Sequence, residues 1–476
     1  MLLNPFNLNP SIPILKPLET NEKIRKYILF LTTLASFVMA FMGSAINIAL
    51  PPIGREFNSS AVLLSWMATA YLLTTAVLLI PVGKASDIFG RAKFFKTGFT
   101  IFTVFSLLSG LAVSDVMLMI FRLFQGVGSA MVFTTSTAII VSAYPASERG
   151  RVIGINTTSV YVGLSTGPFI GGLISNHFGW RYIFFTIFAL CFITAVMIWL
   201  NLKQEWTGNE KEKLDVPGSV FYMISLTLLM LGFTFLPGIP GIALLTTGLA
   251  AFYVFIKLES KKEFPVLNVN LFRTSRTFLF SNLAALINYS ATFAIGFLMS
   301  LYLQNVRGIS PQDAGFILIT QPLLMALFSP FAGRISDRIE PRKVSSIGMA
   351  ILTAGLVLFI FIGESTDLTL IVTNLAVIGF GFAMFSSPNA NAIMSSVEKS
   401  YYGVAASTMS SMRMVGQMFS MGIVIVIFTL IIGKAEISRD NIPLFIQSLR
   451  AAFLLFSALC FLGIFASLSR GKIHRD

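Results

Sequence analysis

Apolar runs long enough to cross a lipid bilayer recur along almost the whole sequence. Residues 27–50, 61–82 and 95–113 are the first of about fourteen such runs, and short charged or Gly/Pro-containing segments separate them. About 20 consecutive apolar residues carry an α-helix across the hydrocarbon core. Only helices and closed barrels satisfy their backbone hydrogen bonds there, and continuous runs favour helices over the alternating pattern of barrel strands. The sequence therefore predicts an all-α membrane protein.

Composition and charge agree with this prediction. Of the 476 residues 55% are hydrophobic and 12% charged, which is far from the balance of a soluble domain. The net charge of +13 comes from Lys and Arg in short loops, a pattern that sets membrane topology and does not indicate nucleic-acid binding. Most of these residues lie on the side of the two termini. We therefore expect a multi-pass protein of the plasma or inner membrane with both termini in the cytoplasm.

The runs group into two blocks of six around a pair of additional runs. The segment from Gly83 to Arg91 returns as Gly333 to Arg338, 250 residues later, which indicates an internal duplication with an insertion of two helices. The predicted divisions are a cytoplasmic tail at 1–26, a six-helix bundle at 27–202, a linker with two inserted helices at 203–276, a second six-helix bundle at 277–469 and a tail at 470–476.

The repeated segment resembles a known loop signature. Gly83 to Lys93 is similar to the loop between the second and third helices of the major facilitator superfamily. The resemblance implies a tight turn and charged residues that pair across an inner gate; a charged turn that only sets topology is the alternative. The candidate gating residues are Gly83, Asp87, Gly90, Arg91, Asp337 and Arg338.

A second match contains an arginine within an apolar run. Arg122 to Ala130 is similar to the buried-arginine motif of the same superfamily. An arginine at mid-span costs about 2.5–3.5 kcal/mol, so it normally faces the interior; the alternative is a side chain that reaches headgroups at the outer interface. Asn389, which follows Pro388, is either a cavity group at a kink or part of a helix end. The coupling or substrate candidates are Ser44, Asn47, Tyr71, Arg122, Gln125 and Asn389.

A third match is the most specific. Gly163 to Gly172 looks like the antiporter motif of the superfamily, and with the two inserted helices the chain resembles the fourteen-helix drug:proton antiporters. Small residues let helices approach closely, and proline bends a helix, so this face is suited to pack tightly and move. The motif residues are Gly163, Gly167, Pro168, Gly171 and Gly172.

One position departs from that family. Its members usually have an aspartate before an Asn-Val-Ala-Leu-Pro run on the first helix, and here Met42 precedes Asn47-Ile48-Ala49-Leu50-Pro51. Methionine cannot carry a proton, and Arg122 loses its expected partner. One hypothesis is that Arg122 binds an anionic group of the substrate beside Ser44 and Asn47. The other is that Arg122 only bonds carbonyls of the first helix.

Function follows from these patterns and from the motifs that are missing. The sequence has no phosphate-binding P-loop and no His-Glu-x-x-His, which argues against a primary pump or a membrane enzyme. We expect a monomeric secondary-active transporter without cofactor, metal or nucleic acid, which exports small amphipathic molecules against a proton gradient. The alternatives are an uptake symporter or facilitator for a small, even anionic, metabolite, and a non-transporting membrane sensor.

Overall fold

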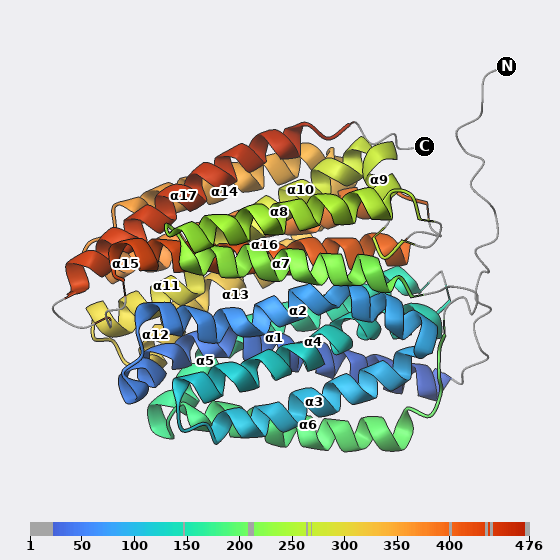
Figure 1. Ribbon diagram of the computed structural model, residues 1–476, viewed down its shortest axis with the longest axis horizontal. Helices are drawn as coiled ribbons and strands as arrows, with labels where there is room; N and C mark the ends of the chain where they lie inside the picture. Colours follow the sequence, from blue (N-terminus) through green and yellow to red (C-terminus); the bar gives the residue numbers. More distant parts are fainter. Residues whose placement is uncertain are drawn as a thin grey trace.

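Long helices make up the computed structural model, which describes residues 22–145, 148–207, 214–262, 265–267, 269–398, 402–433, 437 and 441–471. They lie side by side with their axes roughly aligned (Figure 1). No strand occurs among the described residues. The first turn of α1 and the last turn of α17 lie at the same end of the bundle, here called the terminal end; the other end is called the distal end.

The N-terminal half contains six long helices. In chain order they are α1 (Glu22–Phe57), α2 (Ala61–Phe89), α3 (Arg91–Gly110), α4 (Asp115–Ala143), α5 (Arg149–His177) and α6 (Arg181–Asn201). Helix α1 packs along α5, and α4 packs on both α2 and α3. The pairing leaves α3 and α6 at the edge of this half (Figure 1).

Two helices, α7 (Val216–Phe235) and α8 (Ile239–Glu259), form an antiparallel pair that lies against the line where the halves meet (Figure 1). The hydroxyl of Tyr222 in α7 donates to the carbonyl of Ala76 in α2. On its other side α7 meets α16, where a Cβ on Gly422 would stand 2.6 Å from the Phe233 ring. The inserted pair therefore contacts both halves.

The C-terminal half repeats the arrangement with more broken helices. Its elements are α9 (Val269–Thr274), α10 (Arg276–Thr292), α11 (Ile295–Leu301), the π-helix Tyr302–Val306, α12 (Pro311–Leu318), α13 (Thr320–Arg338), α14 (Pro341–Ile360), α15 (Leu368–Ser395), α16 (Tyr402–Ile431) and α17 (Ile442–Leu468). The segments from Arg276 to Val306 and from Pro311 to Ser336 are each one candidate span.

Twelve helical segments of the described chain are long and apolar enough to cross a membrane. Helices α3 and α5, with 20 and 29 residues, have the length of a span but a more polar composition, since α5 carries the serines, threonines and glycines of the antiporter-like motif. The all-α membrane fold is confirmed. The number fourteen stays a prediction, as do the domain boundaries.

Side chains at the loop ends explain where several helices begin. Ser60, Ser114, Ser275 and Ser310 each accept a hydrogen bond from a backbone N–H in the first turn of the helix that follows. Between α2 and α3 the chain reverses at Gly90, whose φ of 116° is unfavourable for residues with a Cβ. These local signals explain where α2, α4, α10 and α12 begin and where α2 gives way to α3.

The halves touch most closely towards the distal end. Ser300 Oγ donates to the Asn47 carbonyl at 2.6 Å, and Gln304 Nε2 donates to the Ile48 carbonyl at 3.1 Å. Gln304 Nε2 also contacts Ser300 Oγ at 3.1 Å, so the two side chains form one linked set. We call Asn47, Ile48, Ser300 and Gln304 the distal seam.

Candidate functional site

Arg122 lies in the interior of the N-terminal half and is 1% exposed. Its Nη1 donates to Gln125 Oε1 at 2.5 Å, one turn along α4. Its guanidinium stands 4.4 Å from the centre of the Tyr71 ring, a cation–π contact from α2. The carbonyl of Met67 is 3.5 Å from its Nε. Neutral groups thus stabilise this charge among the described residues.

Further hydrogen bonds hold these neutral partners in place. Gln125 Nε2 donates to Ser106 Oγ at 2.8 Å, and the Tyr71 and Ser129 hydroxyls are 2.6 Å apart. The side chains of Arg122, Gln125 and Tyr71, which the sequence singled out, therefore meet in one network. Ser106 and Ser129 were not predicted, because a serine in an apolar run is usually satisfied by its own helix.

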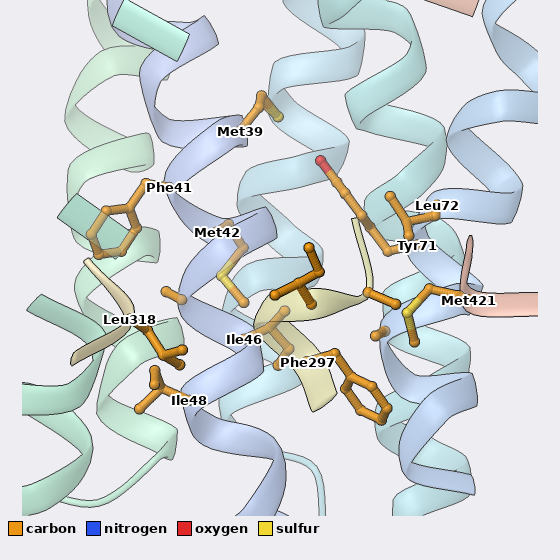
Figure 2. Close-up of a cluster of buried hydrophobic side chains, with 14 of the residues drawn as sticks. Met39, Phe41, Met42, Ile46, Ile48, Tyr71, Leu72, Phe297, Leu318 and Met421 are labelled. Carbon is orange, nitrogen blue, oxygen red and sulfur yellow. The ribbon is translucent and has the colours of Figure 1, made fainter. Parts of the chain in front are cut away.

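Met42 contributes to an apolar cluster and not to this network. Its side chain is fully buried together with Tyr71, Phe297 and Met421 (Figure 2). Ser44 Oγ donates to backbone carbonyls of α1 and α5, and the Asn47 carbonyl belongs to the distal seam. No bond joins Ser44 or Asn47 to Arg122 in the described chain. A role for these residues with Arg122 stays a prediction.

Asp115, seven positions before Arg122, is not its partner. The Asp115 carboxylate accepts hydrogen bonds from Ser59 Oγ at 3.1 Å and from the Val116 N–H at the start of α4. Every described Asp and Glu likewise lies at a helix end or in a connecting segment. The described spans therefore contain no carboxylate at mid-length.

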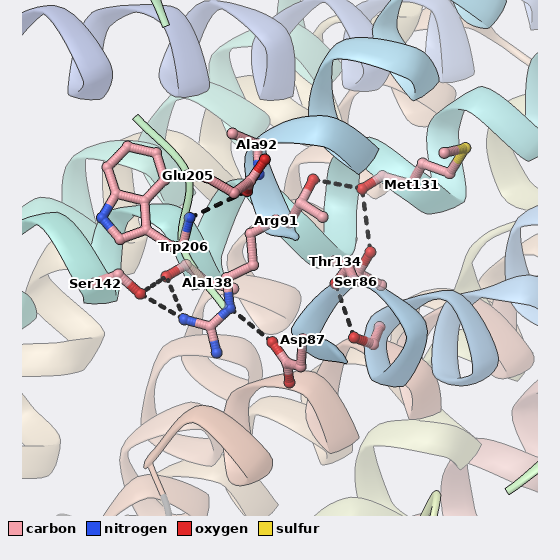
Figure 3. Close-up of polar contacts among 12 residues, drawn as sticks. Ser86, Asp87, Arg91, Ala92, Met131, Thr134, Ala138, Ser142, Glu205 and Trp206 are labelled. Atoms are coloured by element: carbon pink, nitrogen blue, oxygen red, sulfur yellow. Dashed lines mark hydrogen bonds and ion pairs between the residues drawn. The ribbon is translucent and has the colours of Figure 1, made fainter. Parts of the chain in front are cut away.

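The loop signature is organised within the N-terminal half. Arg91 Nε pairs with Asp87 at 2.6 Å, and Arg91 Nη1 contacts Ser142 Oγ at 2.5 Å and the Ala138 carbonyl at 3.4 Å (Figure 3). Gly83 packs against Thr134 of the same half. In this structure Asp87 pairs with Arg91, and Arg91 bonds α4 of the same half, whereas the resemblance implied pairing across the inner gate. A gating role stays a prediction.

A residue that sequence reasoning missed completes this loop. Glu205 lies in the segment after α6. Its carboxylate accepts hydrogen bonds from the backbone N–H groups of Ala92 at 2.7 Å and Lys93 at 3.1 Å, so it caps the start of α3 (Figure 3). A Cβ on Gly90 would stand 2.7 Å from the Glu205 carboxyl carbon. Nothing local signals this contact, because 113 residues separate Glu205 from Ala92.

The second copy of the signature lies at the end of α13. A Cβ on Gly333 would stand 2.9 Å from Ser387 Oγ of α15, and Arg338 is exposed in the last turn. The side chain of Asp337 lies outside the described residues. Glu340, at the position that corresponds to Gly90 in the first copy, forms an ion pair with Arg342 at 3.0 Å.

The antiporter-like motif joins α5 to two different helices. Gly163, Gly167 and Gly171 face α1: a Cβ on Gly163 would stand 2.5 Å from the Phe37 carbonyl oxygen, and one on Gly171 3.1 Å from Ala45 Cβ. The next face meets α12 of the other half. There a Cβ on Gly172 would stand 2.5 Å from the Pro311 carbonyl oxygen, and the Pro168 carbonyl touches Gly315. The small residues allow this close approach.

Asn389 is an interior group and not part of a helix end. Helix α15 continues past Pro388 to Ser395, so the alternative of a proline-capped end is wrong. The Asn389 side chain is 3% exposed, and its Oδ1 is buried without a hydrogen-bond partner among the described residues. A buried amide oxygen of this kind is a potential acceptor for a ligand or water.

One known protein family matches most of this chain. The profile described as Major Facilitator Superfamily matches residues 32–272 and 282–474. The chain belongs to the Major Facilitator Superfamily. The resemblance that the loop and glycine motifs indicated is thereby confirmed, and the protein is a multi-pass membrane transporter.

Two relatives that are 30% identical to this chain have names that describe what they transport or resist. The riboflavin transporter RibZ of Clostridioides difficile is 30% identical over 389 residues, which cover 81% of this chain and 84% of that protein. The multidrug resistance protein Stp of Mycobacterium tuberculosis is 30% identical over 400 residues, covering 82% and 73%.

Among solved structures, a bacterial homologue of the human lysosomal transporter Spinster in an inward-facing, unoccupied conformation matches with a TM-score of 0.69 and 16% identity. The match covers 95% of this chain and 98% of that one. At this identity the likeness shows the fold alone.

Proposed function

We propose that this protein is a secondary-active exporter of small amphipathic molecules that works by alternating access. The observation that supports this most is the position of Gly172 and Pro168 at the junction of α5 with α12. A junction between two halves that consists of backbone against backbone has few side chains to disengage when the halves rock. Relatives named as a multidrug resistance protein and as a multidrug transporter support the export of amphipathic molecules.

The bonds between the halves suggest which end closes. The distal seam and the α5–α12 junction hold one end, while Asp87 and Arg91 at the other end bond within their own half. If the terminal end is cytoplasmic, as the positive residues predict, this arrangement corresponds to a site accessible from the cytoplasm. We propose that proton uptake on the outer side drives the return, through a group that is not at position 42.

Reconstitution in liposomes tests the proposal. Liposomes that contain the purified protein are loaded with ethidium, with riboflavin or with a fluorescent anion. Flux of each probe is followed with and without an imposed pH gradient. Acceleration of flux by the gradient supports a proton-linked exporter. Flux at the same rate with and without the gradient excludes proton coupling. The absence of flux for all three probes contradicts the export proposal.

A second candidate is transport of a small metabolite. The relative named as a riboflavin transporter favours it, since its similarity extends over 81% of this chain. The same liposomes distinguish the two: saturable flux of riboflavin alone indicates a metabolite transporter, and flux of several unrelated amphipaths indicates a multidrug exporter.

A further inference from the structure

Arg413 in α16 is a second arginine within a span, and it differs from Arg122 in its surroundings. Its Nε is buried without a hydrogen-bond partner, and no ion pair reaches its guanidinium among the residues that the structure describes. Arg122, in contrast, is held by Gln125 and Tyr71. Ionisable groups inside a membrane bundle are expensive and usually mark the path of a substrate or ion.

Helix α16 packs on α10 beside Arg413, since a Cβ on Gly416, one turn after Arg413, would stand 2.8 Å from Tyr289 Cβ. The Tyr289 hydroxyl lies near Tyr161 of α5 and Ser386 of α15, and it is within electrostatic reach of Arg413. The hydroxyls of Tyr161 and Ser386 are 2.8 Å apart. Tyr161 belongs to the N-terminal half and the other members of this cluster to the C-terminal half. The cluster therefore lies between the halves.

The cluster lies deep within the bundle. Arg413 follows the first residue of α16 by 11 positions, and Tyr161 follows the first residue of α5 by 12. At a rise of 1.5 Å per residue this is roughly 16–18 Å from the terminal ends of these helices. Both residues therefore lie within the apolar spans, about three turns away from the helix ends.

The charge in this region is positive. The described Asp and Glu residues all lie at helix ends or in connecting segments, so none of them balances Arg413 at this depth. Beside the hydroxyls lies an aromatic surface, where the rings of Tyr289 and Phe382 meet edge to face at 5.4 Å. A guanidinium with hydroxyl donors and an aromatic wall suits an anionic group on a planar apolar body.

We infer that Arg413, Tyr161, Tyr289 and Ser386 form a binding site for the anionic group of an aromatic amphipath. The inference rests on the proposed transport function, whose substrate class it specifies. The guanidinium pairs with the carboxylate, phosphate or sulfonate oxygens, and the hydroxyls donate to the same oxygens. Because Tyr161 comes from the opposite half, an occupied site joins the halves and links substrate binding to their movement.

Direct binding tests this site without requiring flux or a proton gradient. Two matched pairs of fluorescent probes are suitable: flavin mononucleotide with riboflavin, and 1-pyrenebutyrate with 1-pyrenebutanol. Fluorescence anisotropy with the full chain in detergent gives the affinities. We expect the wild type to prefer the anionic member of each pair, and Arg413→Gln to weaken anion binding by about ten- to a hundredfold.

Three variants control the experiment. Arg413→Gln must bind the neutral probes as the wild type does, which shows that it folds; Arg413→Lys retains part of the anion preference because it keeps the charge. Arg450→Gln removes a cation of α17 that donates to the Ile362 carbonyl at 2.9 Å, and leaves the preference unchanged. Tyr161→Phe weakens anion binding by a smaller factor, since it removes one hydroxyl.

The outcomes separate this inference from the proposed function. A wild type without anion preference, or without binding of any probe, overturns the inference, as does an Arg413→Gln variant that keeps the preference. If the preference and its loss are observed but liposomes show no flux, the site stands and the exporter proposal fails. If flux occurs equally for anionic, neutral and cationic probes, the exporter stands and the anion site fails.

Discussion

Gly172 in α5 lies directly against the Pro311 carbonyl at the start of α12, so that a Cβ on Gly172 would stand 2.5 Å from that oxygen. The contact joins the two halves of the transporter at the distal end. It is made by backbone atoms, which cannot move aside as a flexible side chain does. A substitution here therefore acts on the junction itself.

Gly172→Ala is expected to disfavour the conformation described here. Overpacking costs about 1–3 kcal/mol, which corresponds to a population shift of roughly 5- to 150-fold if the junction opens in the other conformation. Transport rate in liposomes is the measurement. Gly154→Ala on the same helix is the matched control, since a Cβ there meets nothing within 4 Å. Equal rates for both variants would contradict a moving junction.

Gln125 is expected to stabilise the fold because its Oε1 accepts a hydrogen bond from the Arg122 guanidinium. Gln125→Leu leaves the buried guanidinium without its acceptor at 2.5 Å, and hydrogen bonds to charged groups contribute about 1.5–3 kcal/mol. Gln125→Glu keeps an acceptor and adds a compensating charge. Thermal unfolding in detergent should show a lower Tm for the leucine variant than for the glutamate variant. A common Tm would show that Arg122 does not depend on position 125.

Gln304 is expected to hold the distal end closed. Gln304→Leu removes the hydrogen bonds to Ile48 and Ser300, whose loss of about 1–3 kcal/mol in total shifts the populations by roughly 5- to 150-fold. A cysteine at the buried Met421 reports this opening by its rate of labelling with an impermeant thiol reagent. The native Cys191 and Cys460 are fully buried and give a low background.

The control for this experiment is Thr429→Val. Its hydroxyl donates only to Ile425 of its own helix, so the substitution removes a hydrogen bond of the same kind without touching the distal seam. Labelling should be faster in Gln304→Leu and unchanged in Thr429→Val. Faster labelling in both variants would indicate general loosening of α16 and not release of the seam.

Asp215 at the start of α7 is expected to stabilise the inserted helices at every pH above its unfolded pKa. Burial by itself raises the pKa of Asp215, but hydrogen bonds with Glu259, with Lys262 and with the Gly218 N–H together lower it below the ordinary value of 3.8. A carboxyl whose folded pKa is lowered stabilises the fold above its unfolded pKa. That contribution is lost only as the pH falls through the folded value.

Asp215→Asn tests this directly. The amide oxygen still caps the Gly218 N–H at the start of α7, but the pairing with the Lys262 ammonium is lost. Burial and Asp215 raise the pKa of Glu259 to about 7, so Glu259 carries the proton that it donates to Asp215 only below that pH. The difference in Tm between wild type and variant should therefore grow as the pH falls from 8 to 6, stay constant from pH 6 to pH 5 and shrink only below about pH 4. A difference that already shrinks between pH 7 and pH 5 would mean that Asp215 titrates higher than its hydrogen bonds imply.

The sequence by itself determined the class of this protein. Runs of about 20 apolar residues have one stable form in a bilayer, and the Gly83 and Gly163 motifs are continuous stretches whose residue types follow from a tight turn and from close helix packing. Such features are local, so they are visible before folding. The network of Arg122 with Gln125 is partly of this kind, because the two residues lie one turn apart on α4.

The tertiary structure alone decided which residues far apart in the chain meet. Glu205 caps α3 across 113 residues, and Tyr161 meets Ser386 across 225. It also distinguished the two arginines, since Arg122 donates to Gln125 while Arg413 Nε has no hydrogen-bond partner among the described residues. The physical reason is that every span is apolar enough to pack against several others. The identity of its neighbours therefore depends on how all the helices share one interior.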